Sequence, residues 1–303
     1  MRILFITSTR IGDAVLSTGL LDHLLRQYPE ARFTVACGPV AEGVFTRMPR
    51  LERLIVLAKK RWSLHWLELW WQVGFSRWDL VVDLRGSAMA WLLRTKRRAV
   101  MRGGRRAGHR LVHIADTLGV TPPPRPVVWF DAAEAGRAEA LLPGAPWLIL
   151  GPTANWAVKT WPAARFVSLA SRLTAPGGVL AGARIAILGG PGEQERAAAA
   201  PVLAALPGAV DLVGKLPLPE VAAVLERAAL YVGNDSGLMH IAAATGAPTL
   251  GLFGPTPASE YGPVGPRAEA VLADGPPAGS PMDRLSVNAV VEAATRLLAP
   301  VPA

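Results

Sequence analysis

Residues 231–254 read YVGNDSGLMHIAAATGAPTLGLFG and predict a strand, a tight polar turn, a helix and a second strand. Asp235 or Ser236 is placed to cap the helix, and Gly237 lets a ligand come close to the backbone. The free N–H groups of the first helical turn, together with the helix dipole, form a site for an anion such as a diphosphate. An ordinary capped helix has the same pattern, so the rest of the chain has to decide between the two interpretations.

The composition indicates a folded protein whose positive charge is unevenly spread. The chain has 303 residues, 51% of them hydrophobic and 18% charged, and its single cysteine, Cys37, lies in an apolar run that predicts a small buried thiol. Residues 1–148 carry 22 Lys/Arg against 12 Asp/Glu, a net charge of +10, whereas residues 149–303 carry 10 against 11, a net charge of −1. We therefore expect the first half to face a second anionic partner, distinct from a nucleotide bound near Asp235.

Several classes of protein are not expected from this sequence. The N-terminus has no long apolar core and no cleavage site of small residues, and no apolar run reaches the roughly 18 residues of a spanning helix, so a cytoplasmic location is expected. Zinc-type Cys/His spacing is absent, and no DxD-type pair is offered to a diphosphate-bound Mg²⁺. We therefore expect neither a metal nor a cofactor.

Predicted strands and helices alternate in both halves of the chain. The first half opens with a strand at 3–8, the turn STRIGD and a helix at 14–28, and the second opens, after PGAP, with a strand at 147–150. This alternation predicts an α/β protein of two parallel-sheet domains, 1–146 and 147–303, that face each other across a cleft.

Two segments of the first half are unusual. Residues 59–78, KKRWSLHWLELWWQVGFSRW, place Trp62, Trp66 and Trp70 on one predicted helical face behind a basic cluster. Such rings suit either core packing or the edge of a membrane or glycolipid. Residues 94–110 hold eight Lys/Arg and no acid. A solvated basic loop is the simplest interpretation, and a phosphorylated lipid or saccharide at a membrane surface fits the run better than nucleic acid, because no nucleic-acid module surrounds it.

Five motifs extend over nearly the whole chain: IGDAVLSTGLLDHLLRQYPEARF, WDLVVDLRGS, KTWPAARFVSLASRL, LGGPGEQERA and, most specific, GNDSGLMHIAAATGAPTLGLFGPT. Together they resemble glycosyltransferase family nine, bacterial heptosyltransferases that transfer heptose from ADP-heptose to the inner core of lipopolysaccharide. The resemblance implies the GT-B architecture of two Rossmann-like domains, with the acceptor side in the first and the nucleotide-sugar side in the second. It also implies a metal-independent transferase. The sequence departs from many relatives at 150–153, where they have a His- or polar-ended version, and at Gly19, where proline is common.

The resemblance assigns the catalytic residues. It makes Asp13 the general base that takes the proton of the acceptor hydroxyl while that oxygen attacks the anomeric carbon with inversion. It places Lys159 beside the leaving diphosphate, where an ammonium group offsets developing charge. Considered alone, Asp13 is more simply an acid that stabilises a helix N-terminus.

Binding residues are expected on both sides of the reaction. The resemblance implies donor-binding roles for Gly190, Asp235, Ser236, Gly237, Leu238, His240 and either Glu193 or Glu195, the last two as acceptors for the ribose hydroxyls. The first turn and the basic run supply acceptor-binding candidates, which are Gly12, Arg97, Arg98, Arg105 and Arg106. Each has a structural alternative: Asp235 holds its loop, His240 packs inside its helix, and either glutamate is a helix-terminal acid.

We expect an inverting heptosyltransferase that contacts the cytoplasmic face of the inner membrane peripherally and uses a nucleotide sugar and an anionic lipid-linked saccharide. Three alternatives stay open: a transferase of the same family with another nucleotide sugar, a sugar-nucleotide epimerase of similar architecture, and a non-catalytic nucleotide-binding or membrane-associated module. Nucleic acid is not expected as a partner.

Overall fold

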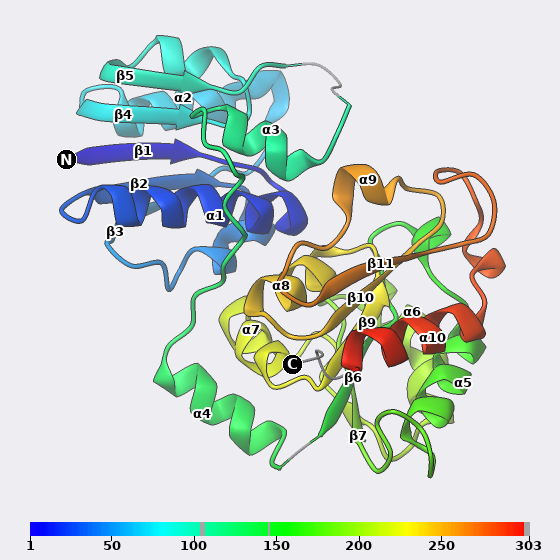
Figure 1. Cartoon of the computed structure of the whole chain (residues 1–303). Helices are drawn as coiled ribbons and strands as arrows, with labels where there is room; N and C mark the ends of the chain where they lie inside the picture. Colours follow the sequence, from blue (N-terminus) through cyan, green and yellow to red (C-terminus); the bar gives the residue numbers. More distant parts are fainter. Residues whose placement is uncertain (104–106, 145, 300–303) are drawn as a thin grey trace. The chain divides into compact units, whose positions relative to one another are not determined.

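Each half of the chain folds into an α/β unit of its own. The computed structural model describes residues 1–103, 107–144 and 146–299, and the chain divides into unit 1, Met1–Phe130, and unit 2, Asp131–Ala303 (Figure 1). Each unit is built on one sheet whose paired strands all run parallel. The predicted pair of parallel-sheet α/β domains is therefore confirmed.

Five strands form the sheet of unit 1, in the order β3-β2-β1-β4-β5. Their bounds are β1 (Arg2–Ile6), β2 (Arg32–Cys37), β3 (Leu51–Val56), β4 (Arg77–Asp83) and β5 (Arg94–Val100). Ile3 of β1 lies opposite Phe33 on one side and Leu80 on the other, so β1 is the central strand. All of β1 except its first residue is buried, as is usual for a parallel strand that is covered on both faces.

Six helical segments accompany this sheet. They are α1 (Ile11–Gln27), η1 (Pro39–Val44), η2 (Arg61–Ser63), α2 (Leu64–Val73), η3 (Ala88–Trp91) and α3 (Arg110–Asp116), where η marks a 3-10 turn. Leu69 and Val73 of α2 and Met89 of η3 pack in one core cluster with Leu4 and Ile6 of β1. The segments α2 and η3 therefore cover the same face of the sheet.

The sheet of unit 2 has six strands in the order β11-β10-β9-β6-β7-β8. Their bounds are β6 (Trp147–Gly151), β7 (Arg184–Ile187), β8 (Val210–Asp211), β9 (Leu230–Asn234), β10 (Thr249–Phe253) and β11 (Ala268–Leu272). The accompanying segments are α4 (Ala132–Leu141), η4 (Ala157–Lys159), α5 (Ala163–Thr174), α6 (Glu193–Ala205), α7 (Leu218–Glu226), α8 (Gly237–Thr245), α9 (Ala258–Tyr261), η5 (Met282–Arg284) and α10 (Val287–Leu298). This strand order is that of a doubly wound nucleotide-binding sheet.

Helix α4 lies with unit 2, although the predicted division at 146 leaves it in the first half. It starts at a capping box between Asp131 and Glu134. Arg137 of α4 forms an ion pair of 2.7 Å with Glu220, which lies on α7. Arg227, just after α7, pairs with Glu139 of α4. These ion pairs join α4 to α7.

The strand order reverses once in each sheet, between β1 and β4 in unit 1 and between β6 and β9 in unit 2. At such a point the loops that follow the two strands leave in opposite directions, so a crevice opens at the carboxyl ends. In unit 1 these loops begin at Thr7 and Leu84, and in unit 2 they begin at Pro152 and Asp235. The predicted catalytic residues Asp13 and Lys159 and the diphosphate-binding residues 235–238 follow three of these strand ends, those of β1, β6 and β9.

A solvated loop was the simplest interpretation of the basic run, but the first half of the run is a strand. Residues Arg94–Val100 form the edge strand β5, whose register pairs Leu80 with Arg97 and Val82 with Ala99. Arginine and lysine are well tolerated on an edge strand, because one side of it faces water, and they discourage pairing with further strands. Arg105 and Arg106 lie outside the described residues.

The three tryptophans of the predicted stripe do not share one helical face. Trp62 lies in η2, before α2 begins, with a left-handed φ of 55°, and its side chain is 86% exposed. Trp66 and Trp70 lie on α2 and pack against the core cluster. Ser63 also has positive φ, so the chain turns between Trp62 and the helix. Core packing is thus the role of Trp66 and Trp70 only.

Cys37 is buried at the end of β2, as predicted, and burial raises the pKa of its thiol to about 12. Within the described residues, no helix is both long enough and apolar enough to span a bilayer.

Candidate active site

A pocket of about 260 Å³ lies in unit 1 beside the carboxyl ends of β1 and β4. The turn after β1, the start of α1, the segments after β4 and β5, and α3 form its walls. The lining residues are Thr7, Ser8, Thr9, Arg10, Asp13, Leu84, Arg85, Met101, Arg110 and Ile114. One carboxylate, Asp13, shares this lining with three arginines, so the pocket suits an anionic ligand that also carries a proton to be removed.

Asp13 lies in the first turn of α1, where its negative charge is favoured by the helix dipole. Ser8 Oγ donates to Asp13 Oδ2 at 3.4 Å, and Arg110 Nε lies 3.5 Å from Asp13 Oδ1. Both distances are long, so the carboxylate is held loosely by a hydroxyl and a cation. It is the predicted base and it faces the pocket.

Asp83, at the end of β4, fixes the loop that carries Arg85 into the pocket. Its carboxylate accepts from Arg85 N at 2.8 Å, from Ser87 N at 3.0 Å and from Ser87 Oγ at 2.5 Å. Burial raises the pKa of Asp83 overall, although the hydrogen bonds from Ser87 and Arg85 oppose the rise. The motif WDLVVDLRGS therefore consists of most of β4 and the turn after it, and Asp83, the last residue of the strand, holds that turn.

The other acceptor-side candidates lie apart from the pocket lining. Gly12 is in the first turn of α1, one residue before Asp13. Arg97 donates to Tyr28 Oη at 3.2 Å, and Arg98 donates to the carbonyl oxygens of Ala90 and Leu93 around η3. Neither arginine lines the pocket. Their part in acceptor binding stays a prediction.

In unit 2 a lysine, an aspartate and a threonine meet beside the turn between β9 and α8. Lys159 Nζ donates to Asp235 Oδ2 at 2.6 Å, and Thr256 Oγ1 donates to the same oxygen at 2.8 Å. The side chains of Lys159 and Asp235 are only 18% and 8% exposed. Two predicted site residues from distant motifs are thus brought into direct contact, and each fixes the other.

A second link joins the same two motifs. Asn234, the last residue of β9, accepts from the backbone N–H of Trp161 through Oδ1 at 3.0 Å. Its side chain is fully buried. The motif KTWP is therefore anchored to the motif GNDSG by both a side-chain ion pair and a side-chain to backbone hydrogen bond.

Helix α8 begins at Gly237, and no side chain caps it. The expected side-chain cap is wrong: Ser236 is the N-cap residue, but its hydroxyl makes no capping hydrogen bond, and Asp235 is bound to Lys159 and Thr256 instead. The first-turn N–H groups are left without a side-chain acceptor, as in a helix that binds an anion at its N-terminus. Leu238 and His240 are buried within this helix.

The Tyr231 side chain leaves no room for a Cβ atom at two positions near the carboxyl ends of the central strands, Gly151 and Gly233. A Cβ atom at Gly151 would lie 2.1 Å from the Tyr231 hydroxyl oxygen, and one at Gly233 would lie 2.2 Å from it. The ring is fully buried, and burial raises the pKa of its hydroxyl more than the neighbouring Ser236 lowers it. This packing accounts for a glycine at both positions.

The glycine turn before α6 separates the two candidate glutamates. Glu195 Oε2 accepts from the backbone N–H of Gly190 at 3.0 Å, so this side chain folds back onto the turn. Glu193, the first residue of α6, is exposed. The turn includes Gly192, whose φ of 108° favours glycine. Glu195 thus holds the turn through Oε2, whereas Glu193 is exposed at the start of the helix.

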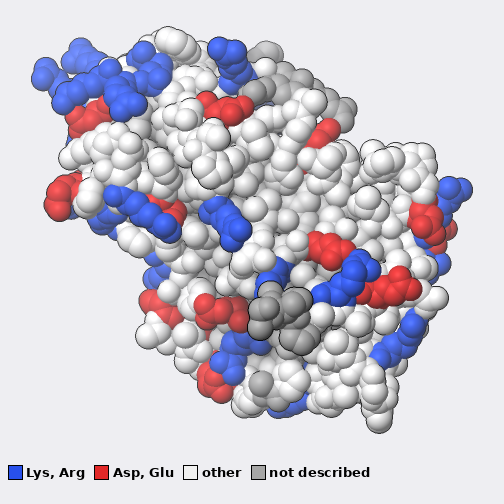
Figure 2. Space-filling view, in the orientation of Figure 1, with Lys and Arg blue, Asp and Glu red and all other residues white. Residues whose placement is uncertain are grey.

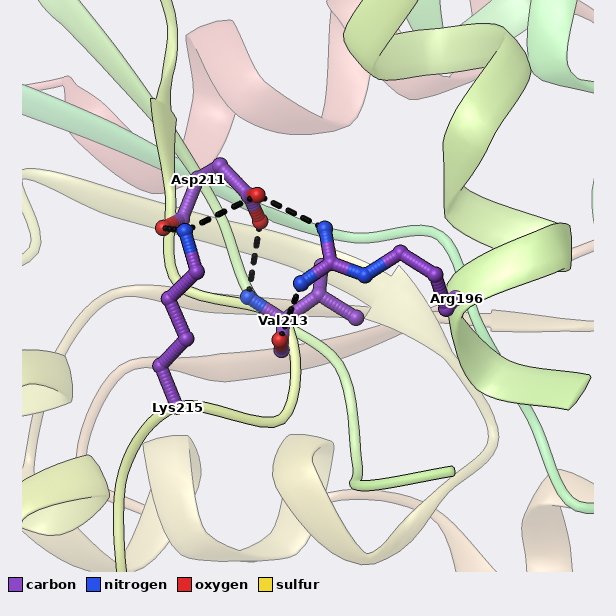
Figure 3. A network of polar contacts seen from close by, with 4 residues as sticks. All are labelled: Arg196, Asp211, Val213 and Lys215. Carbon is purple, nitrogen blue, oxygen red and sulfur yellow. Dashed lines mark hydrogen bonds and ion pairs between the residues drawn. The ribbon is translucent and has the colours of Figure 1, made fainter. Parts of the chain in front are cut away.

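Arg196, one turn into α6, anchors this helix to the segment after β8 (Figure 3). Its Nη1 donates to Asp211 Oδ2 at 2.6 Å and its Nη2 donates to the Val213 carbonyl oxygen at 2.7 Å. Lys215 Nζ reaches the same carboxylate oxygen at 3.0 Å, and Val213 N donates to Asp211 Oδ1. Burial alone would raise the pKa of Asp211, but the hydrogen bonds from Arg196, Lys215 and Val213 lower it overall.

Sequence reasoning missed four residues at these strand ends: Arg10, Arg85 and Arg110 in the pocket and Thr256 beside Asp235. A signal was available for Arg85 and Thr256, because each follows shortly after a predicted strand. Arg110 belongs to the basic run, but nothing in its sequence position distinguishes it from its neighbours. Among the described residues, no group of three or more His, Cys, Asp or Glu is arranged to hold a metal ion.

Residues 111–282, more than half of the chain, match glycosyltransferase family 9 (heptosyltransferase). The chain is also 28% identical over 292 residues to lipopolysaccharide heptosyltransferase 1 of Pseudomonas aeruginosa, an alignment that covers 84% of this chain and 79% of that protein.

Two solved Escherichia coli structures have the same fold. The ADP-heptose LPS heptosyltransferase II gives a TM-score of 0.77 at 20% identity, and covers 98% of both chains. The heptosyltransferase WaaC with ADP gives a TM-score of 0.76 at 20% identity, and covers 98% of this chain and 100% of that one. The expected GT-B type of fold, with two Rossmann-like parallel-sheet units, is confirmed.

Proposed function

This chain belongs to glycosyltransferase family 9, the heptosyltransferases, and we propose that it transfers heptose from ADP-heptose to a lipopolysaccharide inner core. As a member of this family it is a glycosyltransferase. The acceptor hydroxyl oxygen forms a bond to the anomeric carbon of the donor while the bond from that carbon to the diphosphate breaks. Attack from the side opposite to the leaving group inverts the anomeric configuration, and ADP leaves.

The donor half of the proposal rests on unit 2. The N-terminus of α8, which has no side-chain cap, offers backbone N–H groups to the diphosphate, and Lys159 supplies a cation beside it. Asp235, which also accepts from Thr256, holds Lys159 in place, so the lysine charge is preorganised for the negative charge that develops on the leaving group. Glu193, which is exposed at the start of α6, accepts from the ribose hydroxyls, and Glu195 holds the turn through its bond from Gly190 N.

The acceptor half rests on unit 1. Asp13 takes the proton from the attacking hydroxyl, for which a loosely bound carboxylate in a pocket is suited. Arg10, Arg85 and Arg110 bind the acidic groups of the acceptor saccharide. The single observation that carries the proposal is this pocket, in which one carboxylate is lined by three arginines beside the reversal of the strand order.

The proposed acceptor is attached to a lipid, so the enzyme works at a membrane surface. We expect peripheral contact with the cytoplasmic face of the inner membrane and no partnership with nucleic acid. The net charge of +10 over residues 1–148 favours an anionic surface on the acceptor side.

The test begins with thermal stabilisation by ADP, UDP, GDP and CDP without metal. A ligand at about 100 times its dissociation constant adds roughly 2.7 kcal/mol of stability, so a selective response to ADP is measurable as a shift of several degrees. The second step measures transfer from ADP-heptose to a delipidated inner-core saccharide. Selective binding of another nucleotide would mean that the donor is a sugar linked to that nucleotide. A lack of both ADP binding and transfer would overturn the proposal.

A further inference from the structure

Unit 1 exposes a set of large apolar side chains that no part of the described chain covers. We call them the apolar face: they are Leu64, Leu67, Trp71 and Phe75 on or next to α2, Trp62 in η2 and Trp91 in η3. Trp62 is 86% exposed, Phe75 70% and Trp91 66%. Single exposed apolar residues are common, but a group of six around one helix marks a surface that something else covers.

The helix geometry places four of these residues on one surface. Positions 64, 67, 71 and 75 follow spacings of three and four, which place side chains on one side of a helix. His65, Leu69 and Val73, on the other side of α2, are buried. The ring of Trp71 lies 5.8 Å from that of Phe75. Because η3 packs in the same core cluster as α2, Trp91 extends the surface on the same side of the sheet.

Cations surround this surface. Residues 59–102 contain ten Lys/Arg against three Asp/Glu, a net charge of +7. Of the three acids, Glu68 is paired with Lys60, Asp79 with Lys96, and Asp83 is buried. Lys and Arg gather over the part of unit 1 where β4 and β5 begin (Figure 2), close in sequence to Phe75 and Leu92. The excess positive charge therefore adjoins the exposed rings.

Two arginines connect the surface with its surroundings. Arg98 lies over the Trp91 ring at 4.9 Å, and Arg85 lies over the Trp66 ring at 4.9 Å. Arg85 also lines the pocket that contains Asp13. The ring system of α2 and the proposed acceptor pocket are thus neighbours within unit 1.

We propose that the apolar face docks on an anionic phospholipid bilayer, with its rings and leucines in the boundary between headgroups and acyl chains. This inference rests on the proposed function, because a lipid-linked acceptor has to be reached at a membrane. Tryptophan favours that boundary, and lysine and arginine beside it bind lipid phosphates. A second copy of the chain fits less well, because pairing one such face with itself would bring two excesses of positive charge together.

Co-sedimentation with vesicles tests the proposal without any sugar substrate. Wild type is compared with Trp71→Ser/Phe75→Ser and with Trp62→Ser on vesicles of phosphatidylcholine alone and of phosphatidylcholine with phosphatidylglycerol. Trp156→Ser, which removes another exposed tryptophan, from unit 2, is the matched control. We expect preference for the anionic vesicles, a partition coefficient more than about tenfold lower for the double variant, and weaker binding at high salt. The control keeps wild-type binding.

Two further measurements keep the two proposals separate. Circular dichroism and thermal melting check that the variants are folded. We expect them to be folded, because substitutions at exposed positions usually change stability little. On a delipidated acceptor the double variant keeps the wild-type rate, whereas on acceptor embedded in anionic vesicles its rate falls. Failure of transfer with normal vesicle binding would contradict the proposed function alone. Equal vesicle binding by wild type and double variant, or a wild-type dimer that the substitutions dissociate, would overturn the docking proposal.

Discussion

Both units have parallel sheets, but the charged side chains at their strand ends are bound differently, loosely in unit 1 and tightly in unit 2. In unit 1, Asp13 is held at 3.4 Å by Ser8 and at 3.5 Å by Arg110, in a pocket rich in arginine. In unit 2, Lys159 Nζ donates to Asp235 Oδ2 at 2.6 Å, and Thr256 Oγ1 donates to the same oxygen at 2.8 Å. One end has a loosely held carboxylate, and the other has a tightly held cation.

This difference corresponds to two chemical tasks. A base has to change its protonation state during the reaction, so a loose set of partners is an advantage. A cation that stabilises a leaving diphosphate keeps its charge throughout, so rigid positioning is an advantage. The comparison supports our proposal that unit 1 removes the proton and unit 2 stabilises the leaving group.

Asp13→Asn has the largest expected effect. It removes the proton acceptor with almost no change of shape, so we expect kcat for transfer to fall by about 10³-fold. Asp22→Asn, on the same helix, is the control, because Asp22 is paired with Arg26 outside the pocket lining. Initial rates with ADP-heptose and a soluble acceptor measure both. Turnover near the wild-type value in Asp13→Asn would remove Asp13 from the mechanism.

Lys159→Gln follows. Loss of the preorganised cation should lower kcat by about 10²-fold and should weaken binding of ADP as well. Lys96→Gln is the matched control, because Lys96 is an exposed lysine of unit 1 that is paired with Asp79. Steady-state kinetics with varied donor concentration give both parameters. A variant that keeps wild-type kcat and affinity would leave the ion pair with a structural role only.

Gly151→Ala tests the packing of the Tyr231 hydroxyl against the strand ends of unit 2. Its Cβ would meet the Tyr231 hydroxyl at 2.1 Å, so we expect the free energy of unfolding to fall by about 1–3 kcal/mol. Adding Tyr231→Phe should restore part of the loss, because it removes the closest atom. Gly208→Ala is the control, since a Cβ there meets nothing within 4 Å. Thermal and denaturant unfolding provide the values, and an unchanged stability for Gly151→Ala would refute this packing account.

Asp211→Asn is expected to have the smallest effect. The folded protein lowers the pKa of Asp211 below its ordinary 3.8, so its charge contributes stability above that pH, and this contribution disappears as pH falls through the lowered value. Because the partners are partly exposed, the loss at neutral pH should be only about 0.5–1 kcal/mol. Unfolding at several pH values measures it. A difference between variant and wild type that persists at the acid end of the range would contradict this origin.

The sequence predicted the fold and the main motifs because these depend on local pattern. Apolar runs such as RILFI and WLILG predict buried strands, and the turn NDSG before an Ala-rich segment marks a helix start. The family resemblance led to Asp13 and Lys159 through their motifs. Buried Cys37 was likewise predictable from its apolar neighbours.

Contacts between distant segments were not predictable. Nothing in the sequence indicates that Asp235 gives up its capping position to bind Lys159 and Thr256, because that depends on where η4 and the segment after β10 lie. The tryptophan face was misplaced because Trp62 and Ser63 adopt positive φ, which ordinary helical spacing does not reveal. Arg85 and Arg110 reach one pocket only after the sheet brings their loops together.

The division of labour between the units is tested most directly by calorimetric titration of ADP into wild type, Asp13→Asn and Lys159→Gln. We expect the same dissociation constant for wild type and Asp13→Asn, and a value at least about tenfold higher for Lys159→Gln, which corresponds to about 1.4 kcal/mol of lost binding free energy. Weakened ADP binding in Asp13→Asn together with unaffected binding in Lys159→Gln would contradict it.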